Sequence, residues 1–95
     1  MMKTAYEIAK GGGKHSGYLD EYRGKPDHLI VRAIRSLQKQ IALHQQWIQN
    51  PYLKINRDES TARLNALVNK KWPSDIRRLA AQVEVLKGIL QERKS

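Results

Sequence analysis

Cysteine is absent from this sequence of 95 residues, and so are long apolar runs. Without cysteine, the chain can form neither a disulfide framework nor a metal site built on thiolates. No apolar run approaches the length of a membrane span, and residues 1–8 lack the uninterrupted apolar region of a signal peptide. We therefore expect no membrane partner, and we expect any export signal to lie outside this chain.

Acidic residues are scarce relative to basic ones. The chain has 18 Lys and Arg against 9 Asp and Glu, which gives a formal net charge of +9. Residues 1–50 hold 8 basic and 4 acidic residues, and residues 51–95 hold 10 and 5, so the excess belongs to the folded body rather than to a tail. A charge of this size favours an anionic partner such as nucleic acid.

The motifs of two common hydrolytic mechanisms are also absent. The sequence has no HExxH, no paired DxD and no histidine cluster, so we expect neither a metal ion nor another cofactor. The adjacent Asp20 and Glu21 would point apart on a helix. The segment GGGKHSG lacks the spacing of a nucleotide-binding P-loop and follows no strand, so ATP hydrolysis is not expected either.

Helical periodicity dominates the rest of the chain. Residues 2–10 predict a short helix that ends near Lys10, before three glycines. From Pro26, apolar positions recur at intervals of three and four residues and predict one long helix that stops at Asn50-Pro51. The recurring positions are Ile30, Ile34, Leu37, Ile41, His44 and Ile48. Because His44 shares this register, we expect it to be a packing histidine with a hydrogen-bond partner.

The second half predicts a loop, a short helix and a second long helix. In the loop from Pro51 to Asp58, we expect Tyr52, Leu53 and Ile55 to fold back onto the helices. The short helix opens at Glu59 or Ser60, ends within residues 69–72, and turns inward Ala62, Leu64, Leu67 and Val68. A boundary is predicted at Trp72-Pro73, because proline disfavours helical conformation at the preceding residue. The last helix runs from about Pro73 to Glu92.

We therefore expect one all-α domain over residues 1–95. Two long amphipathic helices should pack as an antiparallel pair, since each has one apolar stripe to bury. A short connecting helix and an N-terminal helix, followed by a glycine-rich loop, should cover the remaining apolar edge. Trp47 and Trp72 are expected to anchor the core or the hinge.

The glycine-rich segment from Gly11 to Tyr18 is the candidate functional site. Glycines let the backbone approach a ligand closely, and Lys14 and His15 place a cation beside a group that titrates near neutral pH. No apolar periodicity accounts for His15, which makes it the best acid/base candidate. A solvated linker that happens to carry a histidine is the alternative.

RNA offers chemistry that needs no metal, because its 2′-hydroxyl can attack the adjacent phosphate when a base removes the proton. Asp20 or Glu21 could orient the imidazole. The predicted catalytic residues are Lys14, His15, Tyr18 and Arg23. The predicted substrate-binding residues are Gly12, Gly13, Ser16, Tyr22, Lys25 and Arg32. A basic track beside the loop would comprise Lys3, Lys10, Lys14, Arg23, Lys25, Arg32, Arg35 and Lys39. A second basic group, Lys70, Lys71, Arg77 and Arg78, would surround Trp72-Pro73.

Several segments carry a resemblance to a known family: Lys14 to Leu19 behind the glycines, Ala33 to Ile41 with Asn50-Pro51, Lys71 to Ile76, and Val85 to Leu90. Together they resemble the carboxy-terminal nuclease domains of bacterial polymorphic toxins, in particular the polymorphic toxin type 28 class, which includes contact-dependent growth inhibition toxins. Such toxins stand at the end of large secreted proteins, whereas this chain begins Met1-Met2, as an excised domain, an orphan cassette or a phage-borne relative could.

The resemblance implies a ribonuclease toxin with transfer RNA as the leading substrate, delivered into the cytoplasm of a competing bacterium. It also implies a cognate immunity protein, and some toxins of this kind recruit elongation factor Tu. Two other functions stay open. One is a non-catalytic helical nucleic-acid-binding protein whose loop grips phosphates, and the other is an interaction module for an acidic protein.

Overall fold

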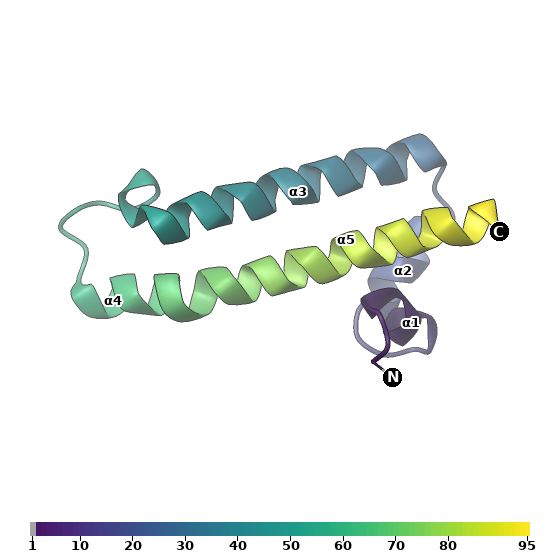
Figure 1. Cartoon of the computed structure of the whole chain (residues 1–95), viewed down its shortest axis with the longest axis horizontal. Coiled ribbons are helices and arrows are strands. Elements are labelled where there is room, and N and C mark those ends of the chain that lie inside the picture. Colours follow the sequence, from purple (N-terminus) through teal and green to yellow (C-terminus); the bar gives the residue numbers. More distant parts are fainter. Residues whose placement is uncertain (1) are drawn as a thin grey trace.

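The computed structural model describes residues 2–95 as an assembly of helices with no strand in that range (Figure 1). Its α-helices are α1 (Ala5–Lys10), α2 (Ser16–Arg23), α3 (Asp27–Gln49), α4 (Thr61–Ala66) and α5 (Trp72–Lys94). A 3-10 turn, η1 (Pro51–Leu53), follows α3, and a π-helical turn, η2 (Leu67–Lys71), joins α4 to α5. The prediction of an all-α fold is confirmed. None of these helices has the length and apolar character that a membrane crossing requires.

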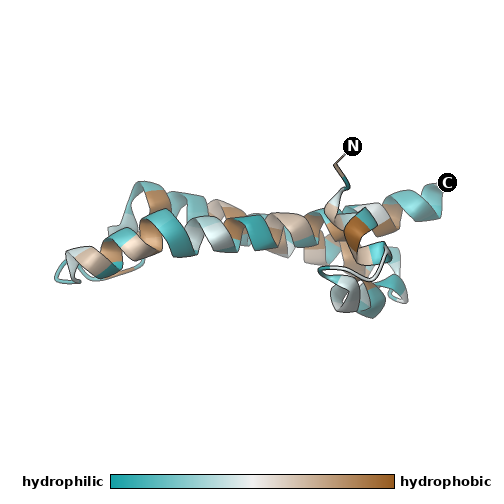
Figure 2. Ribbon diagram, turned by 90° about the horizontal axis from the view of Figure 1, so that it is seen from below, coloured by the Kyte–Doolittle hydropathy of each residue, from teal (hydrophilic) through white to brown (hydrophobic). Residues whose placement is uncertain are grey.

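The body of the molecule is an antiparallel pair of helices of 23 residues each, α3 and α5 (Figure 1). Their apolar stripes meet in one core that includes Ile30 and Ile34 of α3 and Val83 and Leu86 of α5. Figure 2 shows the apolar residues recurring along the long helices between hydrophilic ones, as expected for stripes at helical spacing. The predicted antiparallel pair is therefore confirmed.

The predicted boundary at Trp72-Pro73 is wrong. The chain stays helical from Thr61 to Lys94, because η2 widens the helix for one turn before α5 begins. Pro73 has no N–H to donate to the carbonyl of Asn69, and its ring would crowd that carbonyl in a regular α-helix. The π-helical turn directly before the proline removes this conflict without ending the helix.

The connection between α3 and α5, which forms the tip of the helical hairpin, also differs from the expectation. Tyr52 and Leu53 do not fold back onto the helices, since they are 41% and 62% exposed, whereas Ile55 is half-buried. In the predicted short helix Ala62 is exposed rather than inward, while Leu67 is buried. The tip therefore contributes less to the core than its apolar content suggests.

Two short helices pack against the opposite end of α5. A capping box starts α1, in which the Thr4 side chain accepts from the Glu7 amide and the Glu7 side chain accepts from the Thr4 amide. Helix α2 was not predicted, because Leu19 is its only fully buried residue and its eight residues give too short a pattern. Figure 1 shows α1 on the side of α5 that faces away from α3.

The last turn of α5 fastens these two helices through Glu92 and Arg93. The Glu92 carboxylate accepts a hydrogen bond from the Tyr6 hydroxyl and lies 3.4 Å from Nζ of Lys10 and 3.5 Å from Nη2 of Arg23. Arg93 pairs with Asp27 and donates to the carbonyls of residues 23 and 25, at 2.8 and 2.7 Å. We name these two residues and their partners the C-terminal clamp.

The C-terminal clamp makes the stability of the fold depend on pH in the acid range. The hydrogen bond from Tyr6, with Lys10 and Arg23 nearby, lowers the pKa of Glu92 below its ordinary value of 4.5. A lowered carboxyl pKa stabilises the fold at pH values above 4.5, and this contribution is lost as the pH falls through the folded-state pKa. We expect urea unfolding of wild type and Glu92→Gln to differ at neutral pH and to converge in acid. A difference that stays constant down to acid pH would show that the charge of Glu92 has no part in it.

Gly88 lies under the Tyr6 ring in the C-terminal half of α5. A Cβ atom at this position would overlap the ring, whereas a Cβ at Gly17 would meet no atom within 4 Å. Glycine inside a helix costs up to about 1 kcal/mol relative to alanine, so its presence here is explained by the close approach of Tyr6.

We expect Gly88→Ala to destabilise the protein by roughly 1–3 kcal/mol, the usual cost of overpacking, because Tyr6 must move and α1 with it. The matched control, Gly17→Ala, should leave stability equal or slightly higher, since alanine is the better helix former. Chemical denaturation of both variants measures the difference. A more stable Gly88→Ala variant would mean that Tyr6 does not hold α1 on α5.

Candidate functional site

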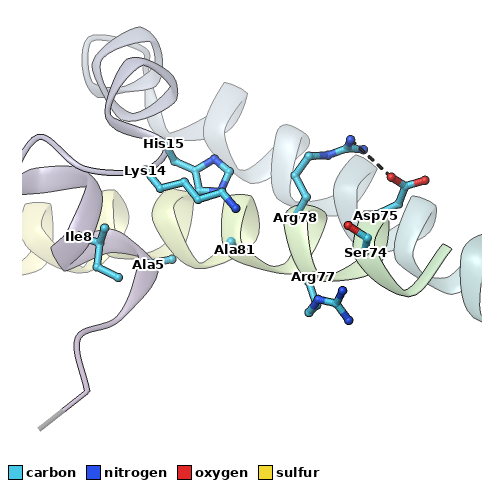
Figure 3. A pocket seen from close by; sticks show the side chains of 9 residues that line it. All are labelled: Ala5, Ile8, Lys14, His15, Ser74, Asp75, Arg77, Arg78 and Ala81. Atoms are coloured by element: carbon cyan, nitrogen blue, oxygen red, sulfur yellow. Dashed lines mark ion pairs between the residues drawn. The ribbon is translucent and has the colours of Figure 1, made fainter. Parts of the chain in front are cut away.

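A pocket of about 490 Å³ lies between the α1–α2 segment and the first half of α5 (Figure 3). Its walls are formed by Ala5, Ile8, Lys14, His15, Ser74, Asp75, Arg77, Arg78 and Ala81. Of the residues from α5, Ser74, Arg77 or Arg78, and Ala81 follow one another at about one helical turn and so share a face. The pocket exists because α1 and α2 are docked on that face beside them.

The loop reaches α5 through a tight turn after α1. The Gly13 amide donates to the carbonyl of Ile8 at 2.9 Å, and a Cβ on Gly13 would lie 2.8 Å from Cγ2 of Ile8. Only glycine fits this approach without a shift of the neighbouring side chain. Gly12, with φ 89°, reverses the chain direction. The glycine run thus places Lys14 and His15 beside α5 instead of forming a free linker.

His15 has an unusual backbone conformation. Its φ of 69° and ψ of 14° are left-handed, and it is the only non-glycine residue among residues 2–95 with a positive φ. This conformation costs a residue with a Cβ roughly 1–2 kcal/mol, although histidine tolerates it better than most. His15 is also the N-cap residue of α2, yet its side chain makes no capping hydrogen bond. The helix start therefore does not explain the choice of histidine.

The imidazole of His15 is partly covered. Its Nε2 atom is shielded from solvent and has no hydrogen-bond partner within the described residues. Burial, together with the positive charges of Lys14 and Arg78, lowers the pKa of His15 below its ordinary value of 6.5. The imidazole is thus neutral at pH 7 and able to accept a proton. Transfer to a molecule in the pocket would use Nδ1, or would require the ring to turn.

The cations that line this pocket come from the loop and from α5. Lys14 lies beside His15, whereas the Arg78 side chain points toward Asp75 and the Arg77 side chain points to the other side of α5 (Figure 3). Nη1 of Arg78 lies 3.6 Å from Asp75, a carboxylate that also lies 3.4 Å from Nζ of Lys71 and 3.6 Å from Nε2 of His44. One acidic group thus faces several basic ones, and the pocket keeps an excess of positive charge suited to a phosphate.

The two arginines were assigned by sequence to the Trp72-Pro73 corner, not to the loop. Residues 74, 77, 78 and 81 fall on one face of α5 by helical spacing, and all four lie within the helix that was predicted from Pro73. No signal in the sequence indicates that the glycine-rich loop docks against this face. Lys14 and His15 line the same pocket as these arginines.

Two other predicted catalytic residues lie elsewhere. Tyr18 packs against the core, and its ring centroid is 4.8 Å from that of Tyr22. Burial, with Tyr22 and Glu21 nearby, raises the pKa of Tyr18 to about 12, so the hydroxyl stays protonated. Arg23 belongs to the C-terminal clamp through Glu92. Neither residue lines the pocket.

The predicted substrate-binding residues fall into two places. Gly12 and Gly13 form the turn that leads to His15, and Ser16 begins α2. A separate depression of about 350 Å³ is lined by Tyr22, Lys25, Leu29, Arg32, Ala33 and Ser36. The basic residues that sequence reasoning joined into one track beside the loop are therefore not one surface, because Arg32 lies at this second depression.

The remaining histidines and tryptophans serve packing or stay on the surface. His44 Nδ1 lies 2.7 Å from the carbonyl oxygen of Gln40, and its ring centroid lies 4.6 Å from that of Trp47 with the rings tilted by 49°, as expected of a packing histidine with a partner. Trp72 is buried against Trp47, as expected for core anchors. His28 is exposed. Within residues 2–95, no three carboxylate or imidazole side chains gather as metal ligands would.

No protein-family model matches this chain, and neither a curated protein nor a solved structure matches it. The resemblance to polymorphic toxin nuclease domains therefore rests on the sequence motifs and stays a prediction.

The electrostatics of the pocket can be tested through His15. We expect its imidazole to titrate below 6.5 in proton NMR, and Lys14→Gln or Arg78→Gln should each move the midpoint upward because a nearby positive charge is removed. Because the folded-state pKa is the lower one, stability should fall as the pH drops from 6.5 through that pKa. The control Lys70→Gln, outside the pocket, should leave the midpoint unchanged. Equal shifts in all three variants would assign the effect to net charge.

Proposed function

We propose that this chain is a metal-independent ribonuclease in which His15 acts as the general base and Lys14, Arg77 and Arg78 hold the scissile phosphate. One observation carries the proposal: a neutral histidine is kept in a costly left-handed conformation, with an unpartnered ring nitrogen, at a pocket rich in cations. Strain and unpaired polar atoms cluster at functional sites, because packing alone would favour a cheaper residue there.

The proposed reaction uses the substrate's own hydroxyl as the nucleophile. His15 takes the proton of the 2′-hydroxyl, whose oxygen forms a bond to the adjacent phosphorus. The cations stabilise the charge that builds up on the other phosphate oxygens. The bond to the 5′-oxygen then breaks, and that oxygen takes a proton for which the ammonium group of Lys14 is one donor in the pocket. The products are a 2′,3′-cyclic phosphate and a 5′-hydroxyl.

The toxin part of the proposal is supported by the sequence motifs. On that basis the substrate is transfer RNA, the site of action is the cytoplasm of a competing bacterium, and elongation factor Tu is a partner to be tested. A cognate immunity protein that covers the pocket should present acidic residues to the same three cations.

A specific observation favours a second function, non-catalytic nucleic-acid binding. Tyr18 and Arg23 lie outside the pocket, and the solvent-shielded atom of His15 is Nε2, so the pocket offers a single imidazole for proton transfer. A phosphate could still be held by the cations. Cleavage requires the imidazole of His15, whereas phosphate binding alone does not.

The variant His15→Asn separates these functions. Asparagine also tolerates the left-handed conformation, so folding stability should be unchanged or slightly higher. RNA cleavage, followed by electrophoresis of total bacterial transfer RNA, should fall by a factor on the order of 100 or more, the scale of a lost acid/base group. Undiminished cleavage would remove His15 from the mechanism.

The matched control is His28→Asn, which changes an exposed histidine outside the pocket and should retain full activity. Cleavage should persist in EDTA and yield cyclic-phosphate ends, and DNA should stay intact because it lacks the attacking hydroxyl. Inhibition by EDTA that magnesium reverses would contradict the metal-independent mechanism. RNA binding without any cleavage by the wild type would favour the second function.

A further inference from the structure

One face of α3 carries a straight row of basic residues. His28, Arg32, Arg35 and Lys39 follow one another at intervals of four, three and four residues, and all four are exposed. Side chains at these intervals are neighbours on a helix surface, about 5–6 Å apart at Cβ. We name this row the cationic ridge. It lies opposite to Ile30, Ile34 and Leu37, which face α5.

Acidic residues do not compensate the ridge. Asp27 is the only acidic residue of α3, and its carboxylate is already paired with Arg93 of the C-terminal clamp. No further carboxylate occurs until Asp58. Helix α5 differs, because its cations alternate with Asp75, Glu84 and Glu92, each of which contacts a basic or backbone partner. Within residues 2–95, no carboxylate lies within ion-pair distance of Arg32, Arg35 or Lys39, because Asp27 is taken by Arg93.

The ridge is a different surface from the pocket at His15. Figure 1 shows α3 along one edge of the molecule and α1 beyond α5 toward the other edge. The pocket is formed by the loop that follows α1 and by α5, and it includes no residue of α3. A depression of about 620 Å³, lined by Asp27, His28, Val31, Arg32 and Arg35, adjoins the ridge instead. Arg32 also borders the depression that contains Tyr22 and Lys25.

We propose that the cationic ridge binds the phosphate backbone of RNA and acts as a second contact for long substrates, remote from the pocket. The proposal rests on the proposed function, because it takes the same RNA as the ligand. A helix face that presents charges in a row, without an aromatic side chain among them, can hold successive phosphates but cannot read bases. The contact should be insensitive to sequence and sensitive to salt.

The chemistry of the ridge favours RNA over the two other anionic partners. A helix that lies on a membrane needs an apolar face beside its basic one, and the apolar face of α3 is packed against α5. Stable protein interfaces are centred on buried aromatic or aliphatic anchors. The only large apolar side chain exposed on α3 in the described chain is Leu43, one turn beyond Lys39. Charge complementarity therefore favours the phosphates of RNA as the partner of the ridge.

The test compares two triple variants that lose the same charge. The ridge variant is Arg32→Gln with Arg35→Gln and Lys39→Gln, and the control variant is Lys70→Gln with Lys87→Gln and Lys94→Gln, which are exposed residues outside α3. Glutamine is a good helix former, so both should fold, which circular dichroism checks. The probe is a fluorescent 2′-O-methylated RNA hairpin, which cannot be cut through its 2′-oxygen, and its affinity is measured against salt concentration.

We expect the salt slope of the ridge variant to fall by roughly 2, since three phosphate contacts are lost at about 0.7 each. The control variant should lose less than one contact. Equal losses in both variants, no loss in the ridge variant, or no binding of the hairpin to the wild type would overturn the proposal. So would a ridge variant that loses binding to phosphatidylglycerol vesicles but keeps its affinity for the hairpin.

Cleavage assays separate this inference from the proposed function. A dinucleotide such as UpA can occupy the pocket only, so the ridge variant should cut it at the wild-type rate while its KM for transfer RNA rises about 10-fold or more. Unchanged KM for transfer RNA, in a wild type that cuts RNA, would overturn the ridge alone. If the wild type cuts neither RNA and the hairpin affinity still depends on the ridge, the ribonuclease proposal fails and the binding surface stands.

Discussion

Helix α5 packs against α3 and also against the two N-terminal helices, α1 and α2, so the positions of all three depend on it. Val83 and Leu86 join the core with α3, while Val85 and Gly88 lie toward the N-terminal helices, and Val85 is fully buried although it is off the main stripe. A helix with one apolar stripe needs one partner, and a wider apolar surface needs two. The N-terminal helices are therefore part of the fold and not an appendage.

This double packing creates the pocket. His15 and Lys14 belong to a segment whose own helices have six and eight residues, too few to be stable in isolation. They meet Arg77 and Arg78 only while the core contacts and the C-terminal clamp hold α1 and α2 on α5. Changes at Glu92 or Gly88, distant in sequence from His15, should thus reach the pocket through the docking of that segment.

Sequence periodicity correctly predicted the helices that carry long apolar stripes. Helix α3 was located within about one residue because its apolar positions repeat over six turns. Helix α2 was missed because Leu19 alone marks its inner face, and the break at Trp72-Pro73 was wrong because a π-helical turn absorbs the proline. Lys14 and His15 could be singled out from local composition. Arg77 and Arg78 could not, since their place depends on the docking of α1 and α2.

The pocket at His15 and the cationic ridge suit different functions because the groups around their charges differ. At the pocket, Asp75 draws Arg78 while burial keeps His15 neutral, so the site combines limited positive charge with a group that can move a proton. Along the cationic ridge, Arg32, Arg35 and Lys39 are exposed and have no ion-pair partner in the described chain, and the ridge does not include the imidazole of His15. Uncompensated surface charge raises the rate and strength of encounter with a polyanion, but it supplies no chemistry. An RNA held at the ridge would raise the local concentration of phosphates around the molecule. The pocket at His15 would then determine which phosphodiester reacts.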